Sequence, residues 1–265
     1  MSFPGGLKAF DLTGRTALVT GSSQGIGRAL AGGLAAAGAR VVVHGRDRAK
    51  AERAAASISD ALGLAGTPAE PIVSTFDVTD ASAVDAGIGE LEASIGTVDI
   101  LVNNAGIQRR APIAEFTDSD WHELLATNLT SAFLLSRRVA RGMQARGTGK
   151  IVNIGSVQSQ IARPSIAPYS ATKGAIVMLT KGLCADLAPS GITVNALAPG
   201  YFATELTKAL VDDVEFSAWV AQRTPAGRWG HVDELVGTLV FLSSDASAFV
   251  NGQTIYVDGG MTAVV

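Results

Sequence analysis

The chain has 265 residues, of which 47% are hydrophobic and 17% are charged, and its net charge is −3. This composition is typical of a globular protein rather than a disordered or fibrous one, and single α/β domains reach about 250 residues. From the length we expect one domain spanning residues 1–265. The small net charge gives no field that would attract nucleic acid or an anionic membrane, so we expect the chain to bind neither.

Short β-branched segments alternate with longer alanine-rich segments along the whole chain. The predicted strands are Thr16–Thr20, Val41–Val43, Ile72–Phe76, Ile100–Asn103, Ile151–Ile154, Thr193–Leu197 and Thr254–Val257. The predicted helices, in which apolar residues recur three and four positions apart, are Gly25–Ala37, Arg48–Leu62, Ala81–Ile95, Ser119–Gln144, Tyr169–Leu187 and His231–Leu242. Residues suited to a left-handed helix end follow five of the helices, namely Gly38, Gly63, Gly96, Gly147 and Gly191. This alternation predicts a doubly wound α/β fold of the Rossmann type with a parallel sheet of about seven strands.

One segment, Tyr201–Gly230, breaks this alternation and carries Phe202, Phe216, Trp219 and Trp229. A helical excursion over the end of a sheet is the usual form of an active-site lid. The sequence therefore predicts a helical substrate lid around residues 201–230.

Several features of the sequence favour a cytoplasmic protein. Cys184 is the sole cysteine, so no intramolecular disulfide can form. The N-terminal residues contain no apolar run of signal-peptide length, and the longest uncharged stretch, Leu187–Thr204, is interrupted by proline and glycine. His44, His122 and His231 are scattered, with no cysteine or carboxylate at metal-ligand spacing, so no metal site is expected.

A glycine-rich segment, Thr20–Gly27, links the first predicted strand to the first predicted helix. Glycines allow a tight turn and a close approach to a pyrophosphate, and the helix N-terminus offers free N–H groups to its charge. The spacing is Gly-x-x-x-Gly-x-Gly, so the motif alone leaves open the alternative of an ordinary turn. Its position between a strand and a helix favours a dinucleotide site.

A second set of polar residues lies in the middle of the chain: Ser156, then Tyr169 and Lys173. The four-residue spacing of Tyr169 and Lys173 places both side chains on one helix face. A phenol has an unperturbed pKa near 10, and a neighbouring ammonium would lower that pKa. The pair is therefore a chemically suitable proton donor, although an isolated Tyr-x-x-x-Lys is more often an ordinary amphipathic pair.

Together these motifs resemble the short-chain dehydrogenase/reductase family. The resemblance rests on features matched in order over nearly the whole chain: Thr20–Gly27, Asn103-Asn104-Ala105-Gly106, Asn128, Ser156, Tyr169, Lys173 and Pro199-Gly200. Within the family, finer features are similar to those of gluconate 5-dehydrogenases: Ala105–Gln108, Ser156–Ser159, Pro199–Leu206 and Arg223–Gly230. The resemblance implies an NAD(P)-dependent oxidoreductase that interconverts D-gluconate and 5-keto-D-gluconate by hydride transfer. It leaves open a 3-oxoacyl-[acyl-carrier-protein] reductase, another short-chain ketone or polyol reductase, and a non-catalytic dinucleotide-binding protein.

The resemblance also implies catalytic roles for four residues. Ser156 would hydrogen-bond the substrate oxygen, and Tyr169 would exchange a proton with that oxygen as general acid or base. Lys173 would bind the nicotinamide ribose and keep the phenol acidic, and Asn128 would hold a water that connects Lys173 to solvent. Because all four residues are present, the non-catalytic alternative is disfavoured.

The same resemblance assigns cofactor contacts to residues near the ends of the predicted strands. They are Gly21, Ser23, Gln24, Gly25, Ile26, Gly27, Arg46, Asp77, Val78, Asn104, Ala105, Gly106, Pro199, Gly200, Phe202 and Thr204, together with Tyr169 and Lys173. Asp77 would face the adenine, although it could equally cap the helix that follows, a role that Thr79 or Asp80 fits better.

The choice between NAD and NADP depends on the end of the second predicted strand, which reads His44-Gly45-Arg46-Asp47. No carboxylate stands at the first two positions to bind a ribose 2′-hydroxyl, whereas Arg46 suits a 2′-phosphate. NADP is therefore favoured. NAD stays possible because Gln24 occupies a position that is basic in many NADP-preferring relatives, and because Asp47 could reach a ribose hydroxyl.

A sugar-acid substrate requires hydroxyl or amide donors and a cation for its carboxylate. The candidate substrate contacts are Ser156, Gln158, Tyr169, Arg109 and Arg163, with Arg110 beside Arg109. Each arginine could instead be a solvated surface residue. An acyl-carrier-protein reductase would need a basic surface, and no cluster beyond Arg109-Arg110 is visible.

The family resemblance implies a homotetramer with two-fold axes. The predicted helices 119–144 and 169–187 would pack against their own copies about these axes. Phe133, Leu134 and Met178 are candidate contact residues, although each could instead belong to the core.

Overall fold

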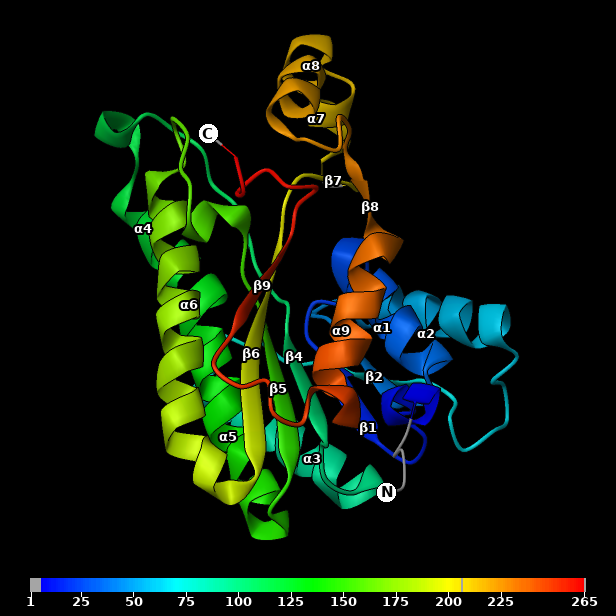
Figure 1. Ribbon diagram of the computed structural model, residues 1–265. Coiled ribbons are helices and arrows are strands. Elements are labelled where there is room, and N and C mark those ends of the chain that lie inside the picture. Colours follow the sequence, from blue (N-terminus) through cyan, green and yellow to red (C-terminus); the bar gives the residue numbers. More distant parts are fainter. Residues whose placement is uncertain (1–5, 206, 265) are drawn as a thin grey trace.

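A parallel seven-stranded sheet forms the centre of the protein, in a computed structural model that describes residues 6–205 and 207–264 (Figure 1). Its strands lie in the order β3-β2-β1-β4-β5-β6-β9. They are β1 (Thr16–Val19), β2 (Arg40–His44), β3 (Ile72–Ser74), β4 (Ile100–Asn103), β5 (Gly149–Ile154), β6 (Ile192–Pro199) and β9 (Thr254–Val257). The prediction of a doubly wound α/β fold is confirmed.

Helices cover both faces of this sheet (Figure 1). They are α1 (Gly25–Ala36), α2 (Arg48–Leu62), α3 (Ala81–Ile95), α4 (Asp118–Leu125), α5 (Ser131–Arg146), α6 (Ala167–Leu187) and α9 (Val236–Ser243). Successive strand residues enter different cores: Ala17 and Val19 pack with α1 and α9, whereas Leu18 packs with α3 and α5. The strands are therefore apolar on both faces, as a covered parallel sheet requires. The five glycines predicted at helix ends all have positive φ, from +65° to +99°.

The predicted helix Ser119–Gln144 is wrong in one respect, because a π-helical turn, Ala126–Thr130, separates α4 from α5. Asn128 lies in this turn and makes a pair of hydrogen bonds with the backbone of Ile107. A π turn widens the helix by one residue and commonly occurs where a side chain makes such a specific contact. The predicted helix His231–Leu242 also differs, since a 3-10 turn, Val232–Leu235, precedes α9.

The segment 201–230 forms an excursion beyond the end of the sheet (Figure 1). It contains β7 (Phe202–Ala203), α7 (Lys208–Val211) and α8 (Val214–Arg223), and β7 pairs with β8 (Gly230–His231). The ring of Tyr201 packs edge-on against three aromatic rings of the excursion at centroid distances of 5.6–5.8 Å, those of Phe216, Trp219 and Trp229. This aromatic cluster holds α8 above the sheet.

Candidate active site

The carboxyl ends of the strands bring the predicted site residues to one edge of the sheet. Successive strands are added on one side of β1 as far as β3 and then on its other side from β4 onward, so the strand order reverses between β1 and β4. The glycine-rich segment and Asn104–Gly106 follow these two parallel strands. Ser156 follows β5, and Pro199 ends β6 on the same edge. Ligands of open α/β sheets bind at such a reversal point. The α7–α8 excursion lies at this edge (Figure 1).

The glycine-rich segment forms a turn whose backbone suits glycine. Gly21 and Gly25 have φ values of +64° and +56°. A Cβ on Gly27 would meet the Gly21 carbonyl oxygen and lie 2.5 Å from Asn104 Nδ2, so α1 can begin this close to β4 only with glycine there. The Gln24 side chain makes no capping hydrogen bond with α1, so the first N–H groups of the helix are available to an anion. This geometry fits a pyrophosphate.

Asn104 holds the glycine-rich turn against β4. Its Nδ2 donates to the carbonyl oxygens of Thr20 at 2.8 Å and Gly21 at 3.2 Å. The backbone N–H groups of Asn104 and Ala105 both donate to Thr20 Oγ1 at 3.0 Å. The side-chain amide of Asn104 is therefore occupied within the fold, so a ligand at this point would meet the backbone of Ala105 and the exposed Gly106.

His44 is buried beneath the same turn in its neutral form. Its Nδ1 accepts a hydrogen bond from the Gly21 N–H at 3.4 Å, and its Nε2 lies 3.1 Å from the Phe76 carbonyl oxygen. Burial lowers the pKa of His44 to about 4, and the Phe76 carbonyl opposes this shift only in part. The hydrogen of the neutral ring is therefore on Nε2, and His44 links the turn to the end of β3.

The residues after His44 bear on the choice between NAD, which has a ribose 2′-hydroxyl, and NADP, which has a 2′-phosphate. A Cβ on Gly45 would lie 3.1 Å from Ser23 Oγ, so a bulky side chain at this position is disfavoured. Arg46 is exposed at the same edge. Asp47 is the N-cap of α2 and accepts a hydrogen bond from the Lys50 N–H at 3.0 Å. The Asp47 carboxylate, which was considered as a partner for a ribose hydroxyl of NAD, therefore caps α2.

Asp77 and Val78 lie in the segment after β3. Two roles were considered for Asp77, namely facing the adenine and capping the next helix. Asp80 caps α3 by accepting from the Ser82 N–H at 2.7 Å. Asp77 instead accepts from the Thr79 hydroxyl at 2.7 Å and the Thr79 N–H at 2.8 Å, and these hydrogen bonds hold the pKa of Asp77 below its usual value. Val78 is buried. Helix capping therefore belongs to Asp80, and Asp77 is held ionised in a tight turn beside it.

Ser156 precedes a short 3-10 turn, Val157–Ser159. Its Oγ accepts a hydrogen bond from the Gln158 N–H at 3.2 Å, and its hydroxyl hydrogen can be donated either to the Tyr169 phenol or to a substrate oxygen. The turn is fixed by Ser159, whose Oγ donates to the Ser156 carbonyl at 2.7 Å and lies 3.0 Å from the Tyr256 hydroxyl on β9. Gln158 is buried at the same place, and its contact with a substrate stays a prediction.

Tyr169 and Lys173 lie on successive turns of α6. Lys173 Nζ donates to the Ile154 carbonyl at 2.8 Å and lies 5.8 Å from the centre of the Tyr169 ring. Burial lowers the pKa of Lys173 to about 8. Burial also raises the pKa of Tyr169, and hydrogen bonding with Ser156 opposes that rise in part. Burial is therefore the largest effect on the pKa of this phenol, and a lowering of that pKa by Lys173 stays a prediction.

Asn128 contacts the segment after β4 and α6. Its Oδ1 accepts from the Ile107 N–H at 2.8 Å, and its Nδ2 donates to the Ile107 carbonyl at 3.0 Å and to Thr172 Oγ1 at 3.3 Å. A Cβ on Gly106 would lie 3.3 Å from Asn128 Oδ1, so this approach is tight. Asn128 positions the two segments, and its role in holding a water near Lys173 stays a prediction.

The segment after β6 passes close to the loop that follows β9. A Cβ on Gly200 would lie 2.8 Å from the Cα of Asp258, so glycine allows this approach. The side chain of Phe202 packs into the core and is 5% exposed, so its predicted cofactor contact could come only from its backbone. Thr204 is tied to Thr207, whose Oγ1 accepts from the Thr204 N–H at 2.8 Å.

Arg109, a predicted substrate contact, lies in two ion pairs with α4. Its Nε lies 3.2 Å from Asp120 Oδ1, and its Nη2 lies 2.7 Å from Glu123 Oε2, both on α4. Its charge is therefore already balanced by two carboxylates. The sequence does not indicate these ion pairs, because they depend on how α4 lies beside the loop, and a contact of Arg109 with the substrate stays a prediction.

Arg110 lies near Tyr169, and Arg163 lies near Arg110. The pKa of Arg110 is lowered by burial and by the charge of Arg163, while Tyr201 and Tyr169 act in the opposite direction. Arg163 is among the substrate contacts predicted from the sequence, and Arg110 is named there only as the neighbour of Arg109. Tyr201 is not among the predicted site residues. Loop arginines carry no periodic signal, and the position of Tyr201 at the base of the excursion depends on the aromatic cluster.

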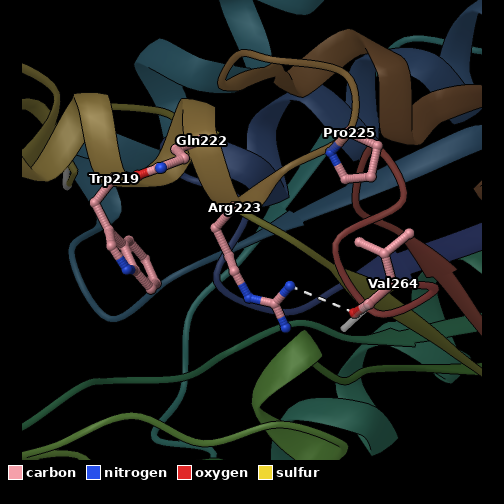
Figure 2. A pocket seen from close by; sticks show the side chains of 5 residues that line it. All are labelled: Trp219, Gln222, Arg223, Pro225 and Val264. Carbon is pink, nitrogen blue, oxygen red and sulfur yellow. Dashed lines mark hydrogen bonds between the residues drawn. The ribbon is translucent and has the colours of Figure 1, made fainter.

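A pocket of about 370 Å³ lies between α8 and the C-terminal segment (Figure 2). It is lined by Trp219, Gln222, Arg223, Pro225 and Val264. Figure 2 shows Arg223 reaching toward the C-terminal segment, where its Nη1 donates to the Val264 carbonyl at 3.4 Å. None of the predicted site residues lines this pocket, so it is separate from the Ser156–Tyr169 site.

Residues 6–205 and 207–264 lack two kinds of feature. In these ranges no helix has the length and apolar character needed to span a membrane. The same residues contain no group of three or more His, Cys, Asp and Glu side chains arranged to hold a metal ion.

Comparison with known proteins relates the whole chain to enzymes of one family. A family model described as enoyl-(acyl carrier protein) reductase matches residues 21–262. The chain is 56% identical to gluconate 5-dehydrogenase of Gluconobacter oxydans, with 96% of each chain covered. It is 49% identical to 5-keto-D-gluconate 5-reductase of Escherichia coli K12, covering 97% of this chain and 98% of that protein.

A solved structure agrees with these relatives. The chain superimposes with a TM-score of 0.92 on a gluconate 5-dehydrogenase from Burkholderia cenocepacia, which was crystallised in complex with NADP and tartrate. The two chains are 57% identical, and the superposition covers 97% of this chain and 98% of the other.

Proposed function

This chain belongs to the short-chain dehydrogenase/reductase family of oxidoreductases, and we propose that it interconverts D-gluconate and 5-keto-D-gluconate with NADP(H) as hydride carrier. Two relatives, at 49% and 56% identity, carry names that describe this reaction. The observation that carries the proposal is the position of Ser156, Tyr169 and Lys173 together at the carboxyl edge of the sheet, beside a glycine turn that fits a pyrophosphate.

The residues of the chain fit NADP at the predicted places. The turn at Gly21–Gly27 and the uncapped start of α1 would hold the pyrophosphate, and exposed Arg46 would bind the 2′-phosphate. Ala105 and Gly106 would border the adenine ribose, and the segment from Pro199 would receive the nicotinamide end. When bound, NADPH supplies the hydride. The neighbour from Burkholderia cenocepacia, which binds NADP, supports this assignment.

The protein residues then supply orientation and a proton. Ser156, whose Oγ already accepts from the Gln158 N–H, donates its hydroxyl hydrogen to the substrate carbonyl oxygen. Tyr169, held neutral by burial, gives its proton to the same oxygen during reduction and takes one back during oxidation. Lys173, fixed by the Ile154 carbonyl, binds the ribose hydroxyls next to the phenol. Asn128 holds the backbone around Ile107 and, as we propose, a water beside Lys173.

A substrate screen tests the proposed reaction directly. Purified protein is mixed with NADPH and, in turn, with 5-keto-D-gluconate, a neutral ketose and an acetoacetyl thioester, and the fall in absorbance of NADPH is followed. We expect the highest kcat/KM with 5-keto-D-gluconate and the reverse reaction with D-gluconate and NADP. Efficient reduction of the thioester, with no activity on either sugar acid, would favour an acyl-carrier-protein reductase instead.

Replacing Arg46 by alanine is expected to raise KM for NADPH with little change in KM for NADH. The charged contact to a 2′-phosphate contributes about 1.5–3 kcal/mol, which corresponds to a change of roughly 10- to 150-fold. Arg48→Ala is a matched control, because Arg48 is also exposed but pairs with Glu52 at 3.7 Å. Equal efficiency of the unmodified enzyme with NADPH and NADH would contradict the assignment of Arg46.

We also propose that the chain forms a homotetramer in the cytoplasm, a reducing compartment that suits a chain with one cysteine, Cys184. Phe133 on α5 is 42% exposed and Met178 on α6 is 63% exposed, whereas Leu134 is buried in the core and is no contact candidate. Light scattering at micromolar concentration should give four times the mass of the chain. Met178→Glu should reduce this mass, and a monomeric unmodified protein would contradict the proposal.

A further inference from the structure

We propose that His44 is a positioning residue for the dinucleotide. Its side chain clamps the start of the glycine-rich turn to the end of β3, and so sets the spacing between the parts of the site that would hold the pyrophosphate and the adenine. His44 is 2% exposed and acts through Gly21 and Phe76 rather than by touching the cofactor. This inference deepens the proposed function and rests on it only for the binding of a dinucleotide.

The backbone of His44 joins β2 to the glycine-rich turn. Its N–H donates to Ser22 Oγ at 2.9 Å, and its carbonyl accepts from the Ser22 N–H at 2.8 Å. Ser22 Oγ in turn donates to the Val19 carbonyl at 2.6 Å, at the end of β1. These hydrogen bonds fix the His44 side chain next to Gly21, the first glycine of the turn.

The imidazole ring of His44 connects two segments that are distant in the sequence. Its Nδ1 accepts from the Gly21 N–H at 3.4 Å, and its Nε2 lies 3.1 Å from the Phe76 carbonyl oxygen. A neutral ring with its hydrogen on Nε2 satisfies both contacts at once. A protonated ring would place a hydrogen on Nδ1, facing the Gly21 N–H, and would lose that contact. The clamp therefore requires the neutral form of His44.

The end of the clamp at β3 is itself held in place. The rings of His44 and Phe76 pack against each other at a centroid distance of 4.3 Å. The Phe76 ring also lies against α3, where a Cβ on Gly87 would meet it, so this approach needs glycine. Asp77 and Val78, the predicted contacts near the adenine, follow Phe76 directly. A shift of Phe76 would therefore move both of these residues relative to the turn.

The surroundings of the His44 ring keep it neutral. Burial lowers the pKa of His44 to about 4, and the Phe76 carbonyl and the charge of Asp77 oppose this shift only in part. Arg46 lies near Asp77 and lowers the pKa of that carboxyl. The glycine-rich turn, which contacts the ring from the other segment, has no charged residue in its sequence. The clamp is therefore complete throughout the neutral pH range.

Two substitutions of His44 test the clamp by fluorescence titration with NADPH. His44→Leu keeps an apolar side chain but removes both ring hydrogen bonds, and we expect it to raise Kd for NADPH about 10- to 30-fold. His44→Asn places its Oδ1 where Nδ1 lies, so it keeps an acceptor for the Gly21 N–H and loses only the donor to Phe76. We expect its Kd to stay within about fivefold of that of the unmodified protein.

Val42→Ala is the control for a loss of packing, because Val42 lies two residues earlier on the same face of β2 and is fully buried. It should lower the thermal midpoint and leave Kd for NADPH within about twofold. If His44→Leu also lowers the thermal midpoint without changing Kd, or if His44→Asn binds NADPH no better than His44→Leu, His44 is only a structural residue and the proposal is wrong.

The ratio of the Kd values of unmodified protein and His44→Asn isolates the ionisation of His44, because asparagine does not titrate and other pH effects are common to both proteins. This ratio should be constant from pH 5 to pH 8, since the pKa of His44 is about 4. An imidazole with the ordinary pKa near 6.5 would lose the clamp within this interval, and the ratio would rise several-fold at pH 5. Such a rise would overturn the proposal.

These titrations contain no sugar, so they separate the role of His44 from the proposed reaction. Weaker binding to His44→Leu that His44→Asn restores supports the clamp even if 5-keto-D-gluconate is not reduced, in which case the proposed reaction alone is wrong. If the unmodified protein binds NADH instead of NADPH, the choice of cofactor is wrong, and the same order of Kd values with NADH supports the clamp. Equal Kd values for the three proteins with whichever cofactor binds overturn it.

Discussion

Replacing Tyr169 by phenylalanine is expected to lower kcat for reduction of 5-keto-D-gluconate by roughly 10²–10⁴-fold, because it removes the proton donor and leaves the ring in place. Dinucleotide binding should change little, since the ribose would be held by Lys173, whose bond to the Ile154 carbonyl does not involve the phenol. NADPH fluorescence titration measures binding, and single-turnover absorbance measures the chemical step. A Phe variant with unmodified kcat would contradict the role of Tyr169.

The pH dependence of the reduction and oxidation rates provides a second test of the role of Tyr169. Burial raises the pKa of Tyr169, so the phenol keeps its proton throughout the neutral range. Reduction, which needs the protonated phenol, should therefore be flat near neutral pH, whereas oxidation, which needs the phenolate, should rise with pH. The residual oxidation rate of the Phe variant should lack this rise. Tyr256→Phe is the control, because its hydroxyl contacts Ser159 rather than the reacting atoms.

A double variant tests whether Ser156 and Tyr169 act as one unit. Residues that stabilise the same transition state give losses that are far from additive. Ser156→Ala combined with Tyr169→Phe should therefore lose little more activity than Tyr169→Phe alone. Losses that multiply would show that the two hydroxyl groups act independently, which would contradict the shared contact with one substrate oxygen.

The sequence predicts the sheet well because a buried parallel strand is apolar on both faces over its whole length. Ile100–Asn103 and Thr254–Val257 have the predicted bounds in the structure, and the remaining strands differ only at their ends. Strand ends are less well predicted because they depend on pairing with neighbours. Lys150, for example, extends β5 by pairing with Thr193 of β6, although neither its charge nor its position in the sequence indicates a strand.

The parts of the site that the sequence predicts poorly all depend on contacts between distant residues. The π turn at Asn128 follows from its bonds to Ile107, 21 residues away, and apolar periodicity on either side gives no sign of it. Neighbouring arginines likewise have different contacts, since Arg109 pairs with two carboxylates of α4, whereas Arg110 donates to the Gln108 side chain. The raised pKa of Tyr169 was not predicted for the same reason, because it comes mainly from burial, and the sequence shows spacing but not solvent exclusion.

Replacing Lys173 by methionine is expected to have opposite effects on activity and on stability. Methionine keeps an unbranched side chain of similar length but loses the ammonium that would bind the ribose. We expect kcat/KM to fall by roughly 10²–10³-fold, within the range usual for loss of a group that assists proton transfer. Lys181→Met is the matched control, because Lys181 lies on the same helix but is exposed.

The stability effect follows from the lowered pKa of Lys173. Lys173 is 6% exposed, and burial lowers its pKa from 10.5 to about 8. Below pH 8 the ammonium is present in both states, and burying it opposes folding by about 3 kcal/mol, at about 1.4 kcal/mol per pKa unit. As the pH rises from 8 toward 10.5 the folded protein releases this proton before the unfolded chain does, so the penalty disappears. The wild type therefore gains stability from this group over that interval.

Methionine carries no such penalty at any pH, so the free energies of unfolding of the two proteins should converge as the pH rises. The difference, variant minus wild type, should be more positive at pH 6.5 than at pH 10 by about 2–3 kcal/mol. The lost hydrogen bond to the Ile154 carbonyl shifts both differences by the same amount and so does not affect this comparison. Urea unfolding of the ligand-free proteins at the two pH values measures this difference in the free energy of unfolding. A difference that is independent of pH, or that grows with pH, would show that Lys173 is not buried as an ammonium.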